Sequence, residues 1–145
     1  MKFALFGNTY QKHKKETVER FLQAVRQHGV ELAVSRLFHD FLVEEVGVDV
    51  PLCTVIDGND FDADIVVCMG GDGTFNEGVN GAVGAVGASC GVIPVGTGND
   101  FTRNFTNREK FWDIGAQLDG KTMKCDLIKY GNRYCVNALN AGFDC

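Results

Sequence analysis

Asp72 is the side chain best placed for chemistry, because it stands inside a glycine turn at residues 70–74, GGDGT. The apolar residues 65–69 come directly before this turn and predict a buried strand that ends there. The backbone amides of such a turn can point at a phosphate, and glycine lets the ligand approach closely. A carboxylate repels a phosphate, so Asp72 either contacts it through a metal ion or polarises an attacking hydroxyl. Both readings indicate phosphoryl transfer, whereas the competing reading is a turn aspartate that bonds its own backbone.

A second glycine turn, GTGND at residues 96–100, follows the predicted strand at residues 90–95. Ligands of parallel sheets bind beyond the carboxyl ends of the strands, where both turns fall. Thr97 and Asn99 are well placed to contact ribose or phosphate, although Asn99 and Asp100 could instead cap the following helix. The nucleotide-binding residues predicted from the two turns and from the helix after the first are Gly70, Gly71, Gly73, Thr74, Glu77, Asn80, Gly96, Thr97, Gly98, Asn99 and Asp100.

Thr74 and Glu77 have the spacing of a capping box, which predicts a helix that starts at Thr74. The helix dipole would then favour an anion at the first turn. Glu77 could equally serve as a cap alone. No lysine or arginine occurs between residues 70 and 98. A cationic side chain that contacts the phosphate must therefore come from another segment. The candidates are Lys12, Lys14, Lys15 and Arg103, with a solvated helix start as the favoured alternative for the three lysines.

The elements that must position these turns follow an α/β order. Strands are expected at residues 2–6, 30–34, 52–56, 65–69 and 90–95, and helices near residues 18–25, 37–42, 74 onward and 109–118. This alternation predicts a three-layer α/β/α, Rossmann-like parallel sheet. Residues 124–130 and 134–139 flank a short turn and predict a β-hairpin. We therefore expect a nucleotide-binding domain over residues 1–122, with residues 123–145 either adding edge strands or beginning a β-rich second domain that is cut short.

Composition narrows the function classes. The formal charge of −5 and the pI near 5.1 argue against nucleic acid as a partner. No run of about 18 apolar residues could cross a bilayer, and no signal peptide is evident, so we expect a cytoplasmic protein that could still contact a membrane peripherally. A homo-oligomer is expected. The six cysteines include no C-x-x-C pair and fit small core side chains better than metal ligands or redox groups.

At its motifs the chain resembles the superfamily of diacylglycerol and other lipid kinases, sphingosine kinases and NAD kinases. The shared signature is GGDGT at residues 70–74. Residues 76–81, 91–101 and 140–144 are similar to bacterial diacylglycerol kinases, so this resemblance covers about residues 64–145. The opening at residues 6–11 and the segment 57–64 look more like NAD kinases of some anaerobic gut bacteria. This likeness to two branches in one chain is open to three interpretations: a natural intermediate, a fusion or a constructed chimera.

The resemblance implies an ATP-binding domain that works with Mg²⁺ and transfers the γ-phosphoryl group to a lipid hydroxyl such as that of diacylglycerol. It places Asp72 at the nucleotide phosphates, Thr97 at the nucleotide and Asp144 near the metal, so Asp72 and Asp144 are the catalytic candidates. The catalytic base of the family lies in its second domain, which implies little activity for residues 1–145 alone. Two alternatives stay open. One is an NAD kinase that phosphorylates the 2′-hydroxyl of NAD, and the other is a non-catalytic or engineered nucleotide-binding scaffold.

Overall fold

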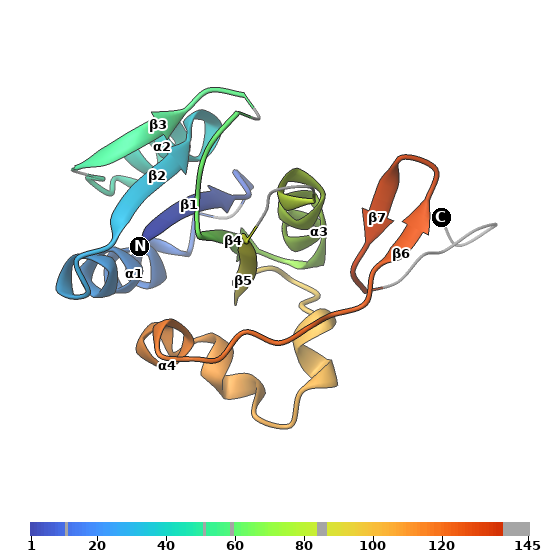
Figure 1. Cartoon of the computed structure of the whole chain (residues 1–145). Helices are drawn as coiled ribbons and strands as arrows, with labels where there is room; N and C mark the ends of the chain where they lie inside the picture. Colours follow the sequence, from blue (N-terminus) through green and yellow to red (C-terminus); the bar gives the residue numbers. More distant parts are fainter. Residues whose placement is uncertain (11, 51, 59, 84–86, 138–145) are drawn as a thin grey trace.

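The structure, a computed structural model, describes residues 1–10, 12–50, 52–58, 60–83 and 87–137. Five parallel strands form its central sheet in the order β3-β2-β1-β4-β5. Their bounds are β1 (Lys2–Gly7), β2 (Glu31–Ser35), β3 (Cys53–Ile56), β4 (Ile65–Gly70) and β5 (Ser89–Pro94). The chain winds outward from β1 to β3 and then in the opposite direction from β4 to β5, so the strand order reverses between β1 and β4 (Figure 1). This arrangement confirms the predicted parallel α/β fold.

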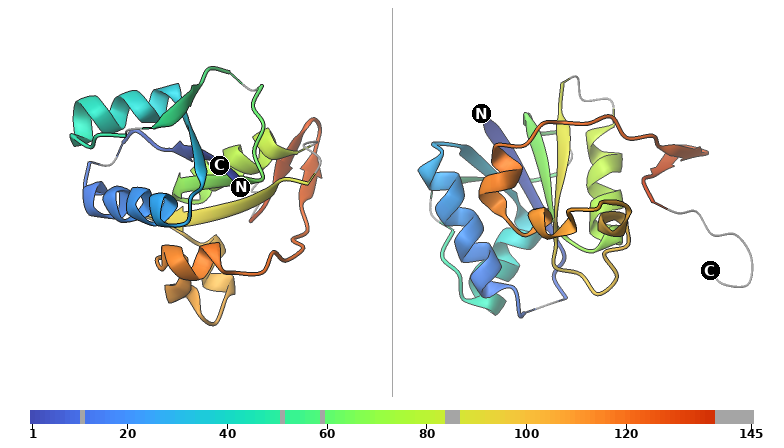
Figure 2. Two further views of the ribbon diagram at one scale, coloured as in Figure 1. Left: turned by 60° about the vertical axis from the view of Figure 1, so that its left-hand side comes forward. Right: turned by 90° about the horizontal axis from the view of Figure 1, so that it is seen from below.

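Helices cover both faces of the sheet (Figures 1 and 2). On one face lie α1 (Lys15–Gln27), α2 (Arg36–Phe41) with its π-helical extension η1 (Leu42–Val46), and the short α4 (Ile114–Leu118). The amphipathic pattern of α1 explains its place, since its buried residues Val18, Phe21, Leu22 and Val25 recur at helical spacing. Together with Phe3, Leu5 and Met69 of the sheet they belong to the larger hydrophobic core.

The opposite face is covered by α3 (Asp72–Ala82), which connects β4 to β5 and packs Phe75 and Val79 against the sheet. A glycine at position 78 allows this close packing. A Cβ atom there would lie 2.1 Å from the Sγ atom of Cys68 on β4. The first residues of α3, from Asp72 to Thr74, belong to the glycine turn that the sequence analysis singled out.

Two helical predictions need correction. The helix expected over residues 109–118 is two short elements, the 3₁₀ helix η3 (Arg108–Phe111) and α4. The break occurs at Asp113, whose carboxylate accepts a hydrogen bond from the amide of Ala116 and so caps α4. In the helix predicted near residues 37–42, Leu37 does not join the buried face, because 80% of its surface is exposed.

The predicted hairpin is present but shorter than expected. Strands β6 (Ile128–Tyr130) and β7 (Arg133–Cys135) pair antiparallel, and residues 138 and 139 of the expected second strand lie outside the described residues. Gly131 begins the two-residue turn with φ 58°, a left-handed value that glycine adopts without strain. In Figure 1 the hairpin lies beyond α3, away from the sheet. Among the described residues, no helix is long and apolar enough to cross a membrane.

Candidate functional site

The two glycine turns meet at the carboxyl ends of β4 and β5. The amide of Val95 donates a hydrogen bond of 3.1 Å to the carbonyl of Gly70. A Cβ atom on Gly96 would lie 2.3 Å from the Cα atom of Gly71. Backbone therefore packs directly on backbone, and glycine is required at position 96 by this contact. The turns form one surface beside the point where the strand order reverses, which is where ligands of doubly wound sheets bind.

Asp72 ties the two turns together. Its Oδ2 atom accepts a hydrogen bond of 2.7 Å from the amide of Asp100, and its Oδ1 atom accepts one of 2.7 Å from the amide of Phe101. Hydrogen bonds to an ionised carboxylate are among the stronger ones in proteins. Both partners lie in or next to the second turn, so the reading of Asp72 as an aspartate that bonds only its own turn is wrong.

The predicted capping box at Thr74 and Glu77 is also wrong. Helix α3 begins at Asp72, with extended Gly71 as its N-cap residue and no side-chain capping bond. The hydroxyl of Thr74 folds back over Gly70, where a Cβ atom would lie 2.3 Å from it. Glu77 instead forms an ion pair with Arg133 of the hairpin. The helix can start earlier than the sequence pattern suggests because contacts with the second turn fix Asp72 in place.

The start of α3 offers free backbone donors. In α3 the first hydrogen bond runs from the amide of Phe75 to the carbonyl of Gly71, so the amides of residues 72–74 have no acceptor within the helix. Gly73 is exposed, and a Cβ atom there would meet no protein atom within 4 Å. Its lack of a side chain is therefore not needed for packing. It leaves open the space that an anion needs to reach these amides.

The second turn is held in shape by Asn99. Its Nδ2 atom donates to the carbonyl of Gly96 at 2.7 Å, and its Oδ1 atom accepts from the amide of the same residue at 3.1 Å. Asn99 itself adopts φ 58°. Thr97 and Gly98 are exposed, whereas Asp100 forms an ion pair of 2.7 Å with Arg103. Neither Asn99 nor Asp100 caps the next helix, η2 (Phe101–Asn104), with its side chain.

Asn80 serves the hairpin in this structure. Its Nδ2 atom donates to the carbonyl of Tyr134 at 2.7 Å, and its Oδ1 atom accepts from the amide of Tyr134 at 2.8 Å. One turn earlier on α3, Asn76 accepts from the amide of Val136 at 3.1 Å. The two asparagines thus hold β7 against α3 through its backbone. The sequence pattern did not indicate this role.

The three lysines that follow β1 are not equivalent. Lys12 forms an ion pair with Glu45, whereas Lys14 is only 2% exposed. The ammonium of Lys14 donates to the carbonyl of Asn8 at 2.8 Å and to its side-chain oxygen at 2.6 Å, and it lies over the rings of Phe38 and Phe41. Burial lowers the pKa of Lys14 to about 8. The expectation of a solvated lysine is wrong at this position, because α2 covers the loop after β1.

The described side chains offer few ligands for a magnesium ion. Among the described residues, no three histidine, cysteine or acidic side chains cluster as metal ligands would. Both oxygen atoms of Asp72 already accept amide hydrogen bonds. Asp144 lies outside the described residues. The described side chains therefore do not by themselves form a magnesium site.

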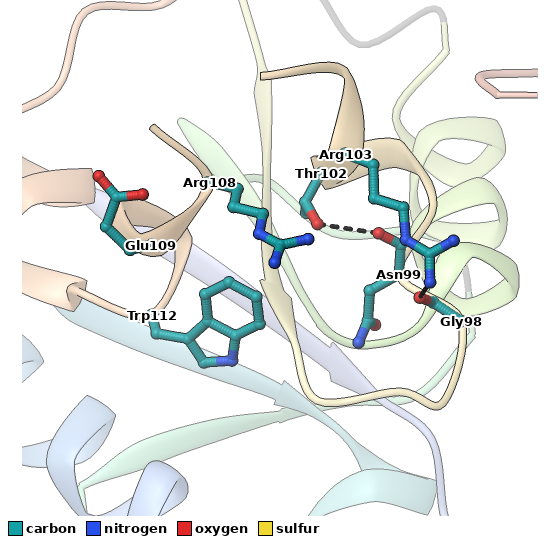
Figure 3. A pocket seen from close by; sticks show the side chains of 7 residues that line it. All are labelled: Gly98, Asn99, Thr102, Arg103, Arg108, Glu109 and Trp112. Carbon is teal, nitrogen blue, oxygen red and sulfur yellow. Dashed lines mark hydrogen bonds between the residues drawn. The ribbon is translucent and has the colours of Figure 1, made fainter. Parts of the chain in front are cut away.

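A pocket that the sequence motifs did not indicate adjoins the second turn (Figure 3). Its volume is about 430 Å³, and its lining consists of Gly98, Asn99, Thr102, Arg103, Arg108, Glu109 and Trp112. Gly98 and Asn99 are among the predicted nucleotide-binding residues, and Arg103 is one of the predicted basic candidates. Arg108 and Trp112 have no motif around them, so nothing in the sequence pattern distinguishes them from other surface residues.

These features define a class of protein: a doubly wound α/β domain whose glycine turns meet at the carboxyl edge of the sheet, as in nucleotide-binding domains. Residues 3–130 match the diacylglycerol kinase catalytic domain family. The chain belongs to that family.

Known relatives come from both branches of the superfamily. An NAD kinase of Bacteroides fragilis is 45% identical over 75 residues, which cover 52% of this chain and 26% of that protein. A diacylglycerol kinase of Staphylococcus epidermidis is 41% identical over 81 residues, covering 54% of this chain and 26% of that protein. Each match spans about a quarter of the relative's length.

A solved structure supports the fold. The crystal structure of yeast NADH kinase complexed with NADH aligns with a TM-score of 0.50 and 15% identity, covering 79% of this chain and 36% of that chain. Identity this low shows a shared fold alone. The family match and the two relatives identify the chain as a catalytic domain of the lipid kinase and NAD kinase type.

Proposed function

We propose that this chain is the ATP-binding domain of a kinase that transfers the γ-phosphoryl group of ATP to a lipid hydroxyl such as that of diacylglycerol. The observation that carries the proposal is the open start of α3. The amides of residues 72–74 have no acceptor within the helix there, and Gly73 is exposed. No packing contact requires residue 73 to be glycine. Family membership and the diacylglycerol kinase relative support the lipid acceptor.

In this proposal the chain positions the nucleotide and compensates the negative charge of its phosphates. The amides at the start of α3 bind the phosphates, helped by the helix dipole. Asp72 acts by holding the second turn against the first through Asp100 and Phe101, which fixes the shape of the phosphate surface. Thr97, exposed in that second turn, is available to the nucleotide. ATP supplies the transferred group, and positioning with charge neutralisation is the main contribution of proteins to such reactions.

One alternative acceptor has a specific observation in its favour. The NAD kinase relative is 45% identical over the matched residues, which supports the 2′-hydroxyl of NAD as the acceptor. The nucleotide surface would be the same in both cases, and the difference would lie in residues that hold the acceptor. The roles of Asp144 and of Mg²⁺, a cytoplasmic location, peripheral membrane contact and a homo-oligomeric state all remain predictions.

Two alanine variants of α3 test the nucleotide site. Gly73→Ala and Gly81→Ala both place a methyl group where no protein atom lies within 4 Å, so both should fold and gain up to about 1 kcal/mol of helix stability. Only Gly73→Ala should block the amides. ATP at 100 times its dissociation constant adds about 2.7 kcal/mol of stability, which thermal unfolding detects. We expect this shift in wild type and Gly81→Ala and its loss in Gly73→Ala. Equal shifts in the two variants would refute the site.

Parallel assays with each candidate substrate test the acceptor. The chain, and any longer form that its gene encodes, is incubated with labelled ATP and Mg²⁺ and offered either diacylglycerol in micelles or NAD. Label in the lipid supports the proposal, whereas label in NAD replaces it with the alternative. If neither acceptor is labelled by any form that binds ATP, the chain is a nucleotide-binding domain without kinase activity.

A further inference from the structure

The outer side of α1 carries a pocket that the proposed nucleotide site does not use. Its volume is about 430 Å³, and it lies between α1 and the segment that follows η1. Leu22 and Val48, both buried, contribute its apolar lining, whereas Glu19, Arg26 and Asp49 contribute charged groups. Figure 2 shows α1 at the periphery of the molecule, on the sheet face opposite α3. We call this feature the α1 pocket.

The charged groups of the α1 pocket have no partners in the part of the chain that the structure describes. Glu19, Arg26 and Asp49 are exposed, and none of them takes part in an ion pair or a side-chain hydrogen bond there. Two carboxylates and one guanidinium group therefore surround an apolar floor and are all available to a partner.

The charges of α1 are arranged symmetrically about the middle of its outer side. Arg26 follows Glu19 by almost two helical turns, so the two side chains lie on one stripe, about 20° apart around the helix axis. Leu22 and Gln23 lie midway between them along the helix and flank this stripe on either side. A two-fold axis that passes between positions 22 and 23 therefore brings Glu19 of one copy opposite Arg26 of the other, and the reverse.

The residues beside such an axis are compatible with it. Gln23 is exposed, and its carboxamide holds both donors and an acceptor, so it can pair with the same group of a second copy. Asp49 offers a second carboxylate to an incoming arginine, whose methylene stem can pack on Leu22 and Val48. A partner of a single charge sign would be repelled by part of this surface. A second copy supplies both signs.

We propose that two copies of this chain associate through the outer side of α1, with Glu19 of each copy paired to Arg26 of the other. This inference goes beyond the proposed function and does not depend on it. The start of α3, to which we assign the phosphates, belongs to the opposite face of the sheet. The two surfaces are therefore separate.

Charge reversal tests the pairing. Because exposed ion pairs contribute little each, we expect a weak dimer, half associated between about 10 µM and about 1 mM at about 0.15 M salt. Sedimentation velocity over this range of concentration measures the association. Glu19→Arg and Arg26→Glu should each weaken it by about tenfold or more, since each variant sets like charges opposite one another twice.

Two rescue experiments are specific to a two-fold arrangement. The doubly reversed chain, with Glu19→Arg and Arg26→Glu together, should associate within about threefold of wild type, because every pair again has opposite signs. An equal mixture of the two single variants should form a heterodimer, since one copy then carries two positive charges and the other two negative charges. Failure of both rescues would overturn the proposed pairing.

Arg20→Glu is the matched control for these variants. Arg20 is exposed on the same helix but lies about 120° around its axis from Arg26 and does not line the pocket. This variant should associate as wild type does, and circular dichroism checks that every variant keeps its helices. Wild type that stays monomeric up to about 1 mM would refute the proposal, and so would a dimer that survives both single reversals. The nucleotide site is tested separately, by Gly73→Ala.

Discussion

At the scale of single residues, Asp72 is a structural link within the proposed site. Its carboxylate spans 28 positions of sequence to hold the amide of Asp100 and the neighbouring amide of Phe101. A negatively charged acceptor suits two amide donors, and no neutral side chain of the same shape replaces it. The negative charge that looked unfavourable beside a phosphate is therefore already partly compensated by the protein.

Replacing this carboxylate tests the link. Asp72→Asn turns one acceptor into an NH₂ donor that faces an amide, so we expect a loss of about 2 kcal/mol in the free energy of unfolding. Urea titration followed by circular dichroism measures it, and the ATP-dependent thermal shift should shrink as well. Asp62→Asn, at an exposed aspartate, is the control and should change neither quantity. Unchanged stability in Asp72→Asn would mean that the link is not needed to hold the turns.

Lys14 makes the stability of the fold depend on pH. Burial lowers its pKa from 10.5 to about 8, so within that interval the unfolded chain binds more protons than the folded chain. The penalty for burying the charge is full below pH 8 and is relieved as the pH rises through this interval. Wild type should therefore gain about 1 to 3 kcal/mol relative to Lys14→Met between about pH 8 and pH 10.5. Denaturant unfolding at several pH values measures the difference.

The control for this prediction is the adjacent lysine. Lys15 is exposed, so Lys15→Met should follow wild type across the same pH range. A constant difference between wild type and Lys14→Met would show that Lys14 titrates normally in the folded chain.

At the scale of elements, the hairpin depends on helix α3. Asn80 pairs with both backbone groups of Tyr134, and Glu77 pairs with Arg133. The exposed ion pair contributes little, so the asparagine contacts should dominate. Asn80→Ala should lower the local stability of the hairpin by about 1 to 2 kcal/mol, seen as faster hydrogen exchange at the amide of Tyr134. Asn104→Ala, which removes an exposed bond to Phe101, should leave that exchange unchanged.

At the scale of the whole molecule, the division into residues 1–122 and 123–145 is a prediction. Among the described residues, the large core lies within residues 3–118, and after residue 122 only Val136, which follows β7, joins the smaller core. We expect residues 1–122 alone to unfold cooperatively in urea, with an α/β circular dichroism spectrum. A gradual, non-cooperative transition would show that the hairpin is part of the same folding unit.

The sheet and the first helix could be predicted because their signals are local. The local sequence alone predicts which residues are buried, both in the apolar run at residues 65–69 and in the helical spacing of Val18, Phe21, Leu22 and Val25. The capping-box prediction failed for the opposite reason. Spacing alone placed the helix start at Thr74, but contacts with Asp100 and Phe101 set it at Asp72.

The sequence by itself determined that two glycine turns follow two strands, and it predicted from them a phosphate-binding surface at the carboxyl edge of a parallel sheet. Only the tertiary structure decided which groups hold the two turns together and which groups surround them. The partners of Asp72, the burial of Lys14, and the pocket formed by Arg108 and Trp112 all depend on contacts between distant segments. Glycine and strand patterns report the local conformation of the backbone, whereas such contacts depend on how helices and loops pack across the sheet.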